Sequence, residues 1–314
     1  MAGGYFKYPF VVRRPVSFSL PLAVASLSWG FNFVAIKVLE PEMGEKALGL
    51  LRFLVMWGLL VVVCRVRGES LRYRKEDKWQ VLLVGAVSMG IYMILFLEGL
   101  ARTGAAEGAI ILATSPIMTY LLSCRVGQEK FQPTSLTGTL VAFLGVTMVV
   151  LGGASSERGT VFGEVLVIAS SITWAISAVM MRPLLSRYEP TQVLTMSMPG
   201  ALPILLIYAT PAVLSTKFGA ISTLGWAMFA HIAILSGVVA FACFYAGLRQ
   251  VGAGGATLYQ YFVPPLAVLF SLLILHKTLG AWQLLGLAVV LTGVILASNA
   301  RRAALAADLA DAAR

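Results

Sequence analysis

GLARTGAAEGAIILATSPIMTYLLSCRVGQEKFQPTSLTGTLVAFLGVTM, from Gly99 to Met148, occurs twice in this chain. The second copy, GLRQVGAGGATLYQYFVPPLAVLFSLLILHKTLGAWQLLGLAVVLTGVIL, runs from Gly247 to Leu296. At a constant offset of 148 and without a gap, twelve of the fifty positions are identical. The matched glycines and the matched proline say more than the matched leucines, because apolar segments resemble one another by chance. The sequence therefore predicts a protein built from two copies of one unit.

The composition is that of a membrane protein. Of the 314 residues 59% are hydrophobic and 12% are charged, and the mean hydropathy is +0.86. Soluble domains are roughly 45–50% apolar and about 25% charged. A helix needs about 17–25 apolar residues to cross a hydrocarbon core of roughly 30 Å. Ten runs meet this length, near 17–37, 46–64, 79–100, 105–125, 134–152, 161–181, 193–213, 224–248, 255–275 and 281–299.

The net charge of +10 is explained by where the Lys and Arg residues lie along the chain, which indicates how the chain is oriented in the membrane. With both termini placed in the cytoplasm, 17 of the 24 Lys and Arg residues fall on the inner side, five fall in outer loops, and two, Lys37 and Arg52, lie within spans. This bias fits the positive-inside rule with an even number of spans, so it does not indicate a nucleic-acid partner. The end of the molecule with the 17 cations is called the predicted cytoplasmic end below, and the opposite end the predicted outer end.

The repeat extends backward to the first and sixth spans. Trp29 aligns with Trp174 at an offset of 145, and Asn32 aligns with Ser177. Each unit then has five spans, an odd number, so the two copies cross the membrane in opposite directions, as in secondary transporters. We expect an all-α membrane protein of ten transmembrane helices in two inverted five-helix repeats, with both termini cytoplasmic. The repeats cover 17–152 and 161–299, joined by the hydrophilic stretch 152–160, and 300–314 is a cytoplasmic tail.

Proline interrupts the fourth and the ninth spans, at Pro116 and at Pro264-Pro265. A proline inside a helix frees the carbonyl four residues earlier, here that of Leu112 and that of Gln260, and kinks the helix. Such a carbonyl must be satisfied by protein or by cavity water inside a membrane. Both bends are therefore expected to face the interior of the bundle and to serve as gating points.

The fifth and tenth spans carry glycines seven residues apart, Gly138 with Gly145 and Gly286 with Gly293. Seven residues are about two helical turns. Each pair therefore lies on one face of its helix and predicts close helix packing.

Three cations lie within the predicted spans or at their ends. Lys37 and Arg182 stand at span ends and are expected to snorkel to the nearer interface. Arg52 follows Lys46 by six residues, so it lies roughly 9 Å deeper at a rise of about 1.5 Å per residue. For Arg52 two interpretations stay open, a role in packing or gating and simple snorkelling.

Three motifs together resemble the EamA family of the drug/metabolite transporter superfamily. They are W-G-x-N-F-x-x-x-K from Trp29 to Lys37, the Arg52-Phe53 pair, and the G-L-x-x-x-G-A turn before a proline-broken helix. The resemblance covers about 17–299. It implies ten helices in two inverted repeats, a central cavity lined by spans 1, 3, 4, 6, 8 and 9, and, in most members, export of small metabolites.

This sequence departs from the family pattern in two ways. The family commonly has an acidic residue after both the fourth and the ninth spans, and here Glu129 keeps the first whereas Lys277 stands at the second. Glu98 and Glu107 sit where the family usually has small or neutral residues. Of the acids in the predicted spans, Glu98 and Glu107 are the ones that we take as candidates for proton coupling. The alternative is an interfacial role, in which the positive end of its own helix stabilises Glu107.

Aromatic walls with a few placed polar groups bind small organic ligands. The same side chains also fill cores and interfacial belts, so packing is the alternative for each of them. The predicted substrate-binding residues are Trp29, Asn32, Tyr92, Phe96, Trp174, Ser177, Tyr245, Tyr259, Gln260 and Tyr261.

Signatures of enzymes are missing from the sequence. It has two histidines and no H-E-x-x-H, P-loop or G-x-S-x-G motif, so we expect no enzyme, no cofactor and no metal site. The predicted function is a secondary transporter in the plasma (inner) membrane that exports amino acids, nucleobases or drugs by alternating access. Its partners are a small-molecule substrate, membrane lipids and, as candidate coupling ion, protons. The alternatives are a facilitator, exchanger or importer of the same substrates, and a membrane sensor without flux.

Overall fold

The computed structural model describes residues 18–103, 105–152, 160–275 and 280–312, and the regular structure in these ranges is helical throughout. Nine segments in them are long and apolar enough to cross a membrane. The expected span near 255–275 is divided by a short turn, so it holds two shorter helices. The prediction of an all-α membrane fold is confirmed.

The bounds of the elements follow the predicted spans. The first half contains α1 (Leu20–Leu39), α2 (Glu45–Val66), η1 (Lys75–Asp77), α3 (Lys78–Gly85), η2 (Ala86–Ile91), α4 (Tyr92–Leu100), α5 (Ala105–Leu112), α6 (Ser115–Arg125) and α7 (Pro133–Leu151). The second half contains α8 (Val161–Leu185), α9 (Pro190–Ser215), η3 (Phe218–Ala220), α10 (Thr223–Ala230), η4 (His231–Val239), α11 (Ala240–Val251), α12 (Ala253–Leu258), η5 (Tyr259–Phe262), α13 (Val263–Leu275) and α14 (Ala281–Ala312).

Several helices begin at residues suited to a helix start. Pro133 and Pro190 open α7 and α9, where the missing N–H would have no partner within the helix in any case. Thr160 Oγ1 accepts from Gly163 N at 3.1 Å and so caps α8. Most of the predicted joint between the halves, residues 153–159, lies outside the residues that the structure describes.

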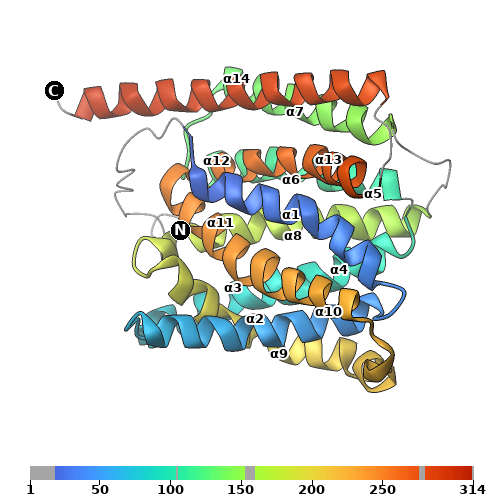
Figure 1. The fold of residues 1–314 in the computed structure, drawn as a ribbon. Helices are drawn as coiled ribbons and strands as arrows, with labels where there is room; N and C mark the ends of the chain where they lie inside the picture. The colour runs from blue at the N-terminus through green and yellow to red at the C-terminus, as the bar shows by residue number, and fades with distance from the viewer. Residues whose placement is uncertain (1–17, 104, 153–159, 276–279, 313–314) are drawn as a thin grey trace.

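The first helix of each half packs against helices of the other half. α7 and α14 lie side by side at one edge of the bundle, and α2 packs against α9 at the opposite edge (Figure 1). Between these pairs, α1 packs against α11 and α13, whereas α8 packs against α4 and α6. The first helix of each half thus contacts the third and fourth spans of the other half. This is the arrangement expected of two inverted repeats.

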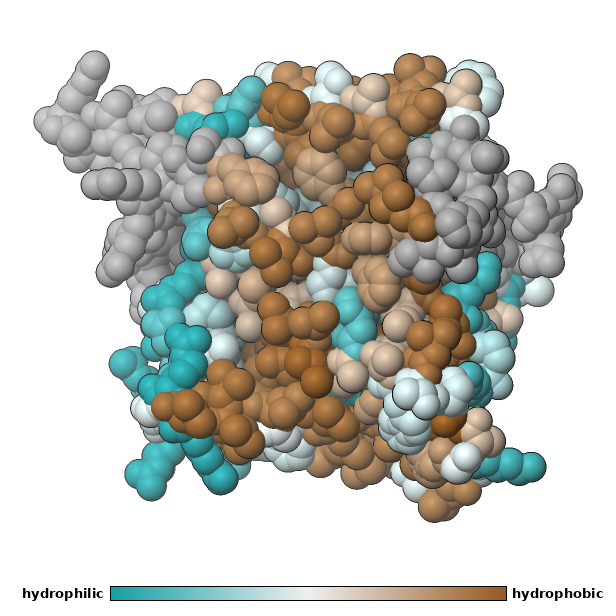
Figure 2. Space-filling model, in the orientation of Figure 1, coloured by the Kyte–Doolittle hydropathy of each residue, from teal (hydrophilic) through white to brown (hydrophobic). Residues whose placement is uncertain are grey.

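The surface is suited to lipid. In Figure 2, apolar residues cross the middle of the visible face, and hydrophilic residues gather toward the two ends of the helices. Large apolar side chains are exposed at the surface of the protein, for example Ile207 at 83% and Ile295 at 57%. A soluble monomer rarely exposes an apolar surface this continuous. The protein is therefore a multi-pass integral membrane protein.

Glycines allow the closest helix contacts. A Cβ atom on Gly145 would lie 2.5 Å from Val290 N, and one on Gly293 would lie 2.2 Å from Ala142 N, so the predicted close packing at these glycines is confirmed, and it joins α7 to α14. A second contact was not foreseen. A Cβ on Gly85 would lie 1.7 Å from the carbonyl oxygen of Ser197, which brings α3 onto the backbone of α9.

The third and eighth spans each contain a π-helical segment, η2 and η4. Ser88 in η2 and Ser236 in η4 are equivalent at the offset of 148. A π turn shifts the backbone hydrogen bonds by one residue and is common at functional sites. The internal symmetry therefore includes the irregular parts of these spans.

The tail, which its alanine-rich sequence predicts to be helical, is continuous with the last span. α14 continues through Asn299 to Ala312 without a break. The stretch after Asn299 is rich in alanine, the residue with the highest helix propensity, which accounts for the continuation.

Candidate functional site: an aromatic cluster at the crossing of the two halves

Two tryptophans meet where α1 and α8 pass through the middle of the bundle. The ring centroids of Trp29 and Trp174 are 6.4 Å apart, with an edge-to-face angle of 78°. Trp29 Nε1 donates to the carbonyl oxygen of Ser236 in η4, and Trp174 Nε1 donates to Gln260 Oε1 in η5, each at 3.2 Å. Both indoles thus donate to irregular segments. The π-helical segment η4 offers Trp29 a backbone carbonyl, and the 3-10 segment η5 offers Trp174 a side-chain oxygen.

Aromatic side chains from α4 and α11 surround the tryptophans. Tyr92 lies 5.1 Å from Trp174, and Phe96 stacks on Tyr92 at 5.6 Å. Phe241 lies 5.3 Å from Trp29. These separations are within the range of favourable ring contacts. We name the group the aromatic cluster; its members are Trp29, Tyr92, Phe96, Trp174, Phe241, Phe244 and Tyr245.

Phe241 was not among the predicted site residues. It precedes Phe244 by three residues and Tyr245 by four, which places all three on one face of α11. That spacing was the signal that could have identified it.

Serines of the crossing helices satisfy the backbone at both helix breaks. Ser26 Oγ on α1 is 2.9 Å from the carbonyl oxygen of Tyr259, and Ser171 Oγ on α8 is 3.3 Å from that of Ile111. The serines are equivalent at the offset of 145 and the carbonyls at 148. The prediction that both bends face the bundle interior is therefore confirmed.

The serines bond the carbonyls one residue before those that the prolines were expected to free, Leu112 and Gln260. The chain forms a short turn before each proline, so Pro116 stands in the first turn of α6, and Pro264 and Pro265 stand in the first turn of α13. Val263 N bonds the Gln260 carbonyl, so the expectation that this carbonyl is freed is wrong.

Ser26→Ala is expected to lower the free energy of unfolding by about 0.5–1.5 kcal/mol, because it removes the side-chain hydrogen bond to the partly buried carbonyl of Tyr259. Ser171→Ala is expected to cost less, because the Ile111 carbonyl also accepts from Thr114 N and Thr114 Oγ1. Denaturant unfolding in detergent measures both. Ser215→Ala, at an exposed position with only a local bond to Ala212, is the control. Equal effects of Ser26→Ala and Ser215→Ala would contradict the prediction.

Four predicted residues lie apart from the aromatic cluster or reach it only in part. The Tyr259 hydroxyl accepts from Ser19 N at 2.9 Å, so this ring points toward the start of α1. Tyr261 is 1% exposed and packs with residues of α7 and α14. Ser177 donates to the carbonyl of Trp174 in its own helix, at 2.8 Å. Among the described residues, Asn32 Oδ1 is buried without a hydrogen-bond partner.

Glu98 joins three helices near the predicted outer end. Its carboxylate pairs with Lys46 of α2 at 2.7 Å and with Arg102, and it accepts from the hydroxyl of Tyr208 on α9 at 2.7 Å. Glu98 therefore has protein partners on several sides. Glu107 stands in the first turn of α5, and its side chain lies outside the described residues.

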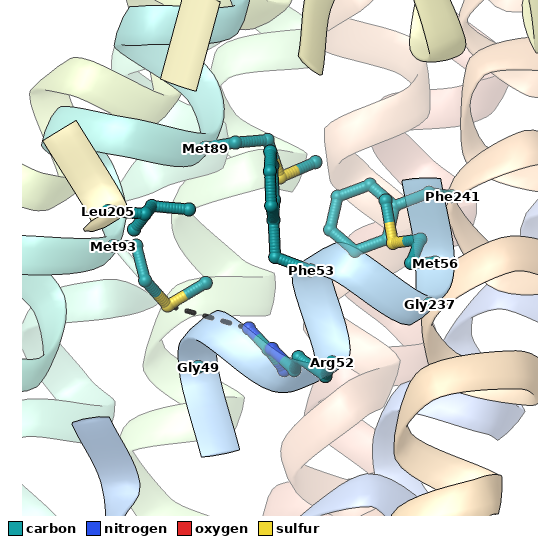
Figure 3. A pocket seen from close by; sticks show the side chains of 9 residues that line it. All are labelled: Gly49, Arg52, Phe53, Met56, Met89, Met93, Leu205, Gly237 and Phe241. Carbon is teal, nitrogen blue, oxygen red and sulfur yellow. Dashed lines mark hydrogen bonds between the residues drawn. The ribbon is translucent and has the colours of Figure 1, made fainter. Parts of the chain in front are cut away.

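Arg52 points into the bundle. Its Nη2 donates to Met93 Sδ at 3.4 Å, and the side chain borders a cavity of about 20 Å³ (Figure 3). The snorkelling interpretation is therefore wrong for Arg52. A cation at the centre of a bilayer costs at least about 2.5–3.5 kcal/mol, and such residues usually mark substrate or ion pathways.

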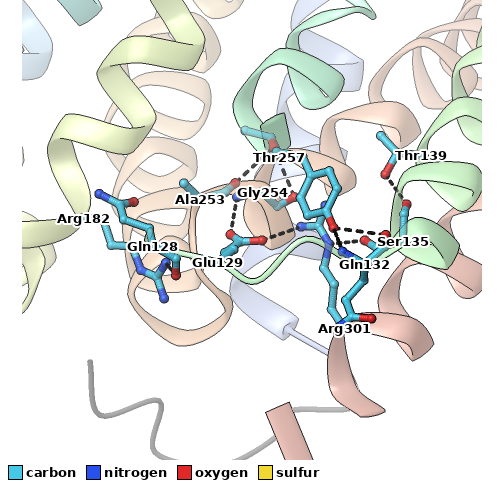
Figure 4. Close-up of polar contacts among 11 residues, drawn as sticks. Gln128, Glu129, Gln132, Ser135, Thr139, Arg182, Ala253, Gly254, Thr257 and Arg301 are labelled. Atoms are coloured by element: carbon cyan, nitrogen blue, oxygen red, sulfur yellow. Dashed lines mark hydrogen bonds and ion pairs between the residues drawn. The ribbon is translucent and has the colours of Figure 1, made fainter. Parts of the chain in front are cut away.

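Charged residues link three helices at the predicted cytoplasmic end (Figure 4). Glu129, after α6, accepts from Gly254 N of α12 at 2.9 Å and lies 3.5 Å from Arg301 Nη1 of α14. Arg182 is 7% exposed, and its Nη1 donates to the carbonyl of Gln128 at 2.6 Å. The expectation that Arg182 snorkels is therefore wrong, because this loop supplies a partner inside the protein.

Comparisons with known proteins agree with this architecture. The "Uncharacterized transporter YetK" of Bacillus subtilis is 27% identical over 292 residues, which cover 91% of this chain and 88% of that protein. The "Probable terminal-alkyne amino-acid exporter" of Streptantibioticus cattleyicolor is 24% identical over 275 residues, covering 88% and 91%. The "Uncharacterized inner membrane transporter YedA" of Escherichia coli is 24% identical over 280 residues, covering 85% and 86%.

A solved crystal structure shares the fold, with a TM-score of 0.77 at 18% identity over 90% of this chain and 98% of the other. The sequence profile of the EamA-like transporter family matches residues 19–151 and again residues 161–299. The first match contains Trp29 and the second contains Trp174. The chain is therefore a membrane transporter that belongs to the EamA-like transporter family.

Proposed function

We propose that this protein is a secondary transporter that exports small organic metabolites, such as amino acids, nucleobases or drugs, across the plasma (inner) membrane by alternating access. The observation that carries the proposal is the contact of Trp29 with Trp174 between two helix breaks. One cluster is shared by both halves, so a rocking of the halves would open it to either side in turn. The breaks before Pro116 and Pro264 would be the points of bending.

The aromatic cluster also supports the substrate class. Its walls are apolar, whereas Gln260 offers a polar contact. This combination suits small organic molecules. The direction is supported by the relative that is named an amino-acid exporter. No cofactor, metal or catalytic residue enters the proposal.

Flux into proteoliposomes tests the proposal. The purified protein is assayed with a panel of amino acids, nucleobases and cationic dyes, with and without an imposed pH gradient. Saturable flux with counterflow supports a transporter, and absence of flux for every compound would overturn the proposal. Binding without flux would instead support the alternative of a membrane sensor.

The pH gradient separates the modes of transport. Acceleration by the gradient supports proton coupling, for which Glu98 and Glu107 are the candidates. If Glu98→Gln and Glu107→Gln both keep the full response, neither couples protons. Flux that ignores the gradient would favour a facilitator or exchanger on the same scaffold.

Trp174→Phe is expected to raise KM roughly twofold to tenfold for any compound that shows saturable flux. Phenylalanine keeps an aromatic ring at this position, but it lacks the indole N–H that bonds Gln260. Such a hydrogen bond contributes about 0.5–1.5 kcal/mol. The matched control is Trp79→Phe, because Trp79 is 75% exposed at the surface of α3. The same KM in Trp174→Phe and wild type would exclude the aromatic cluster as the binding site.

A further inference from the structure

We infer that Arg52 binds the carboxylate of the transported molecule, and that the substrate is a monocarboxylate with an apolar body, such as an apolar amino acid. The inference rests on the proposed function and adds the chemical class of the substrate. It begins from the surroundings of one guanidinium group.

Arg52 lacks an adequate partner in the protein. The guanidinium has five N–H donors, and its hydrogen bond within the described residues is to the thioether of Met93, a weak acceptor. Among those residues it forms no ion pair with a carboxylate. A cation inside a membrane protein is normally paired, so an anion from outside the protein is the missing partner.

The cavity beside Arg52 lies between the two halves. Its lining comes from α2, η2 and α4 of the first half and from α9, η4 and α11 of the second (Figure 3). Transporter substrates bind at such an interface between repeats. Two of these elements, η2 and η4, are the π-helical segments.

The lining selects the chemistry of the ligand. Among the described residues that line it, Arg52 is the one charged residue, and three methionines, Met56, Met89 and Met93, supply flexible apolar surface. A carboxylate matches the guanidinium fork with two parallel hydrogen bonds. A single cation neutralises a monoanion but leaves a phosphate dianion partly uncompensated. The site therefore favours a carboxylate.

The cavity continues toward the aromatic cluster. Phe241 lines the cavity and also contacts Trp29 at 5.3 Å and Trp174 at 6.3 Å. A molecule with its carboxylate at Arg52 would place its apolar body on these rings. The volume of about 20 Å³ admits about one water molecule, so the methionines must change rotamer when substrate enters.

Binding to purified protein in nanodiscs, followed by tryptophan fluorescence and isothermal calorimetry, tests the inference. The probes share one apolar body and differ in the head group: phenylpropanoate, L-phenylalanine, phenylalaninamide, phenethylamine and phenyl phosphate. Wild type is expected to bind phenylpropanoate or L-phenylalanine at least about tenfold more tightly than the amide and the amine, a difference of about 1.4 kcal/mol. Tighter binding of phenyl phosphate, or no binding of either carboxylate, would overturn the inference.

Variants assign the preference to Arg52. Arg52→Gln is expected to weaken carboxylate binding about tenfold or more and not to weaken the binding of phenethylamine, whose ammonium group Arg52 repels, whereas Arg52→Lys, which loses the fork, should lie between. Arg65→Gln removes an exposed cation from the other end of α2 and should bind as wild type does. If Arg52→Gln keeps wild-type carboxylate affinity, Arg52 does not bind the carboxylate.

Two further readouts separate this inference from a structural role and from the transport proposal. Denaturant unfolding of Arg52→Gln in detergent gives the first readout: wild-type stability with weaker carboxylate binding supports a carboxylate site, whereas a loss of stability together with weaker binding of every probe would indicate that Arg52 only packs. Carboxylate-selective binding without flux would support the site and contradict transport. Saturable flux that ignores the carboxylate would support transport and contradict the site.

Discussion

Replacing Glu129 by glutamine is expected to lower the free energy of unfolding by about 3 kcal/mol, one of the largest effects of a single substitution in this chain. The Glu129 side chain is 14% exposed and that of its partner Arg301 is 13% exposed. Removing one member of a buried ion pair leaves an uncompensated charge and costs about 3–5 kcal/mol. Arg182 lies in the same region and would lose a nearby anion as well.

Glu189→Gln is the matched control. Glu189 pairs with Arg249 at 2.7 Å, but the two side chains are 51% and 42% exposed, so its loss should cost about 1 kcal/mol or less. Denaturant unfolding in detergent compares the variants. The double variant Glu129→Gln with Arg301→Gln should recover part of the loss, because the charge of Arg301 is removed together with its partner, although Arg182 still lacks a nearby anion. Equal stability of Glu129→Gln and Glu189→Gln would contradict the prediction.

Gly200→Ala is expected to destabilise the fold by about 3 kcal/mol and to reduce the yield of folded protein. The new Cβ would lie 1.9 Å from the carbonyl oxygen of Leu82, and backbone atoms cannot rotate away as a side chain can. Overpacking usually costs about 1–3 kcal/mol, and a clash with backbone belongs at the upper end of that range. The separation of α3 from α9 is the change that would relieve the clash.

Gly58→Ala separates this effect from the general change of glycine to alanine. Gly58 is also inside a helix, and a Cβ there would meet nothing within 4 Å. Alanine favours helix by about 1 kcal/mol, so this variant should match or exceed wild-type stability. Thermal unfolding monitored by size-exclusion chromatography compares the two. A Gly200→Ala protein that unfolds at the wild-type temperature would show that α3 and α9 are less tightly packed than they are in the structure.

Much of the fold follows from the sequence because the repeat is encoded in residues with special backbone roles. The glycine pairs of α7 and α14 and the two proline breaks are short-range patterns that recur at a fixed offset. The contact of Gly85 with α9 has no such pattern, because it depends on how distant helices pack. The partner of Arg182 was missed for the same reason, since the depth of a residue along a helix does not reveal what the next helix offers.

The site was predictable only in part. Tyr259, Gln260 and Tyr261 are consecutive, and consecutive residues of a 3-10 turn point about 120° apart. One of them, Gln260, therefore reaches Trp174, whereas Tyr261 faces α7 and α14. Arg52 could be identified as unusual from its depth, but its thioether neighbour and the adjoining cavity become visible only when both halves are assembled.

The unequal network around Glu129 has a thermodynamic consequence. Two identical inverted halves would give the inward-facing and outward-facing forms the same free energy by symmetry. Here Glu129 is matched by Lys277, and Ile111 by Tyr259, at the offset of 148. Under the proposed cycle the empty carrier therefore has a preferred resting orientation, and each 1.4 kcal/mol of preference changes the population ratio about tenfold. A substrate turns the carrier over only if it binds the less populated orientation more tightly by at least a comparable amount.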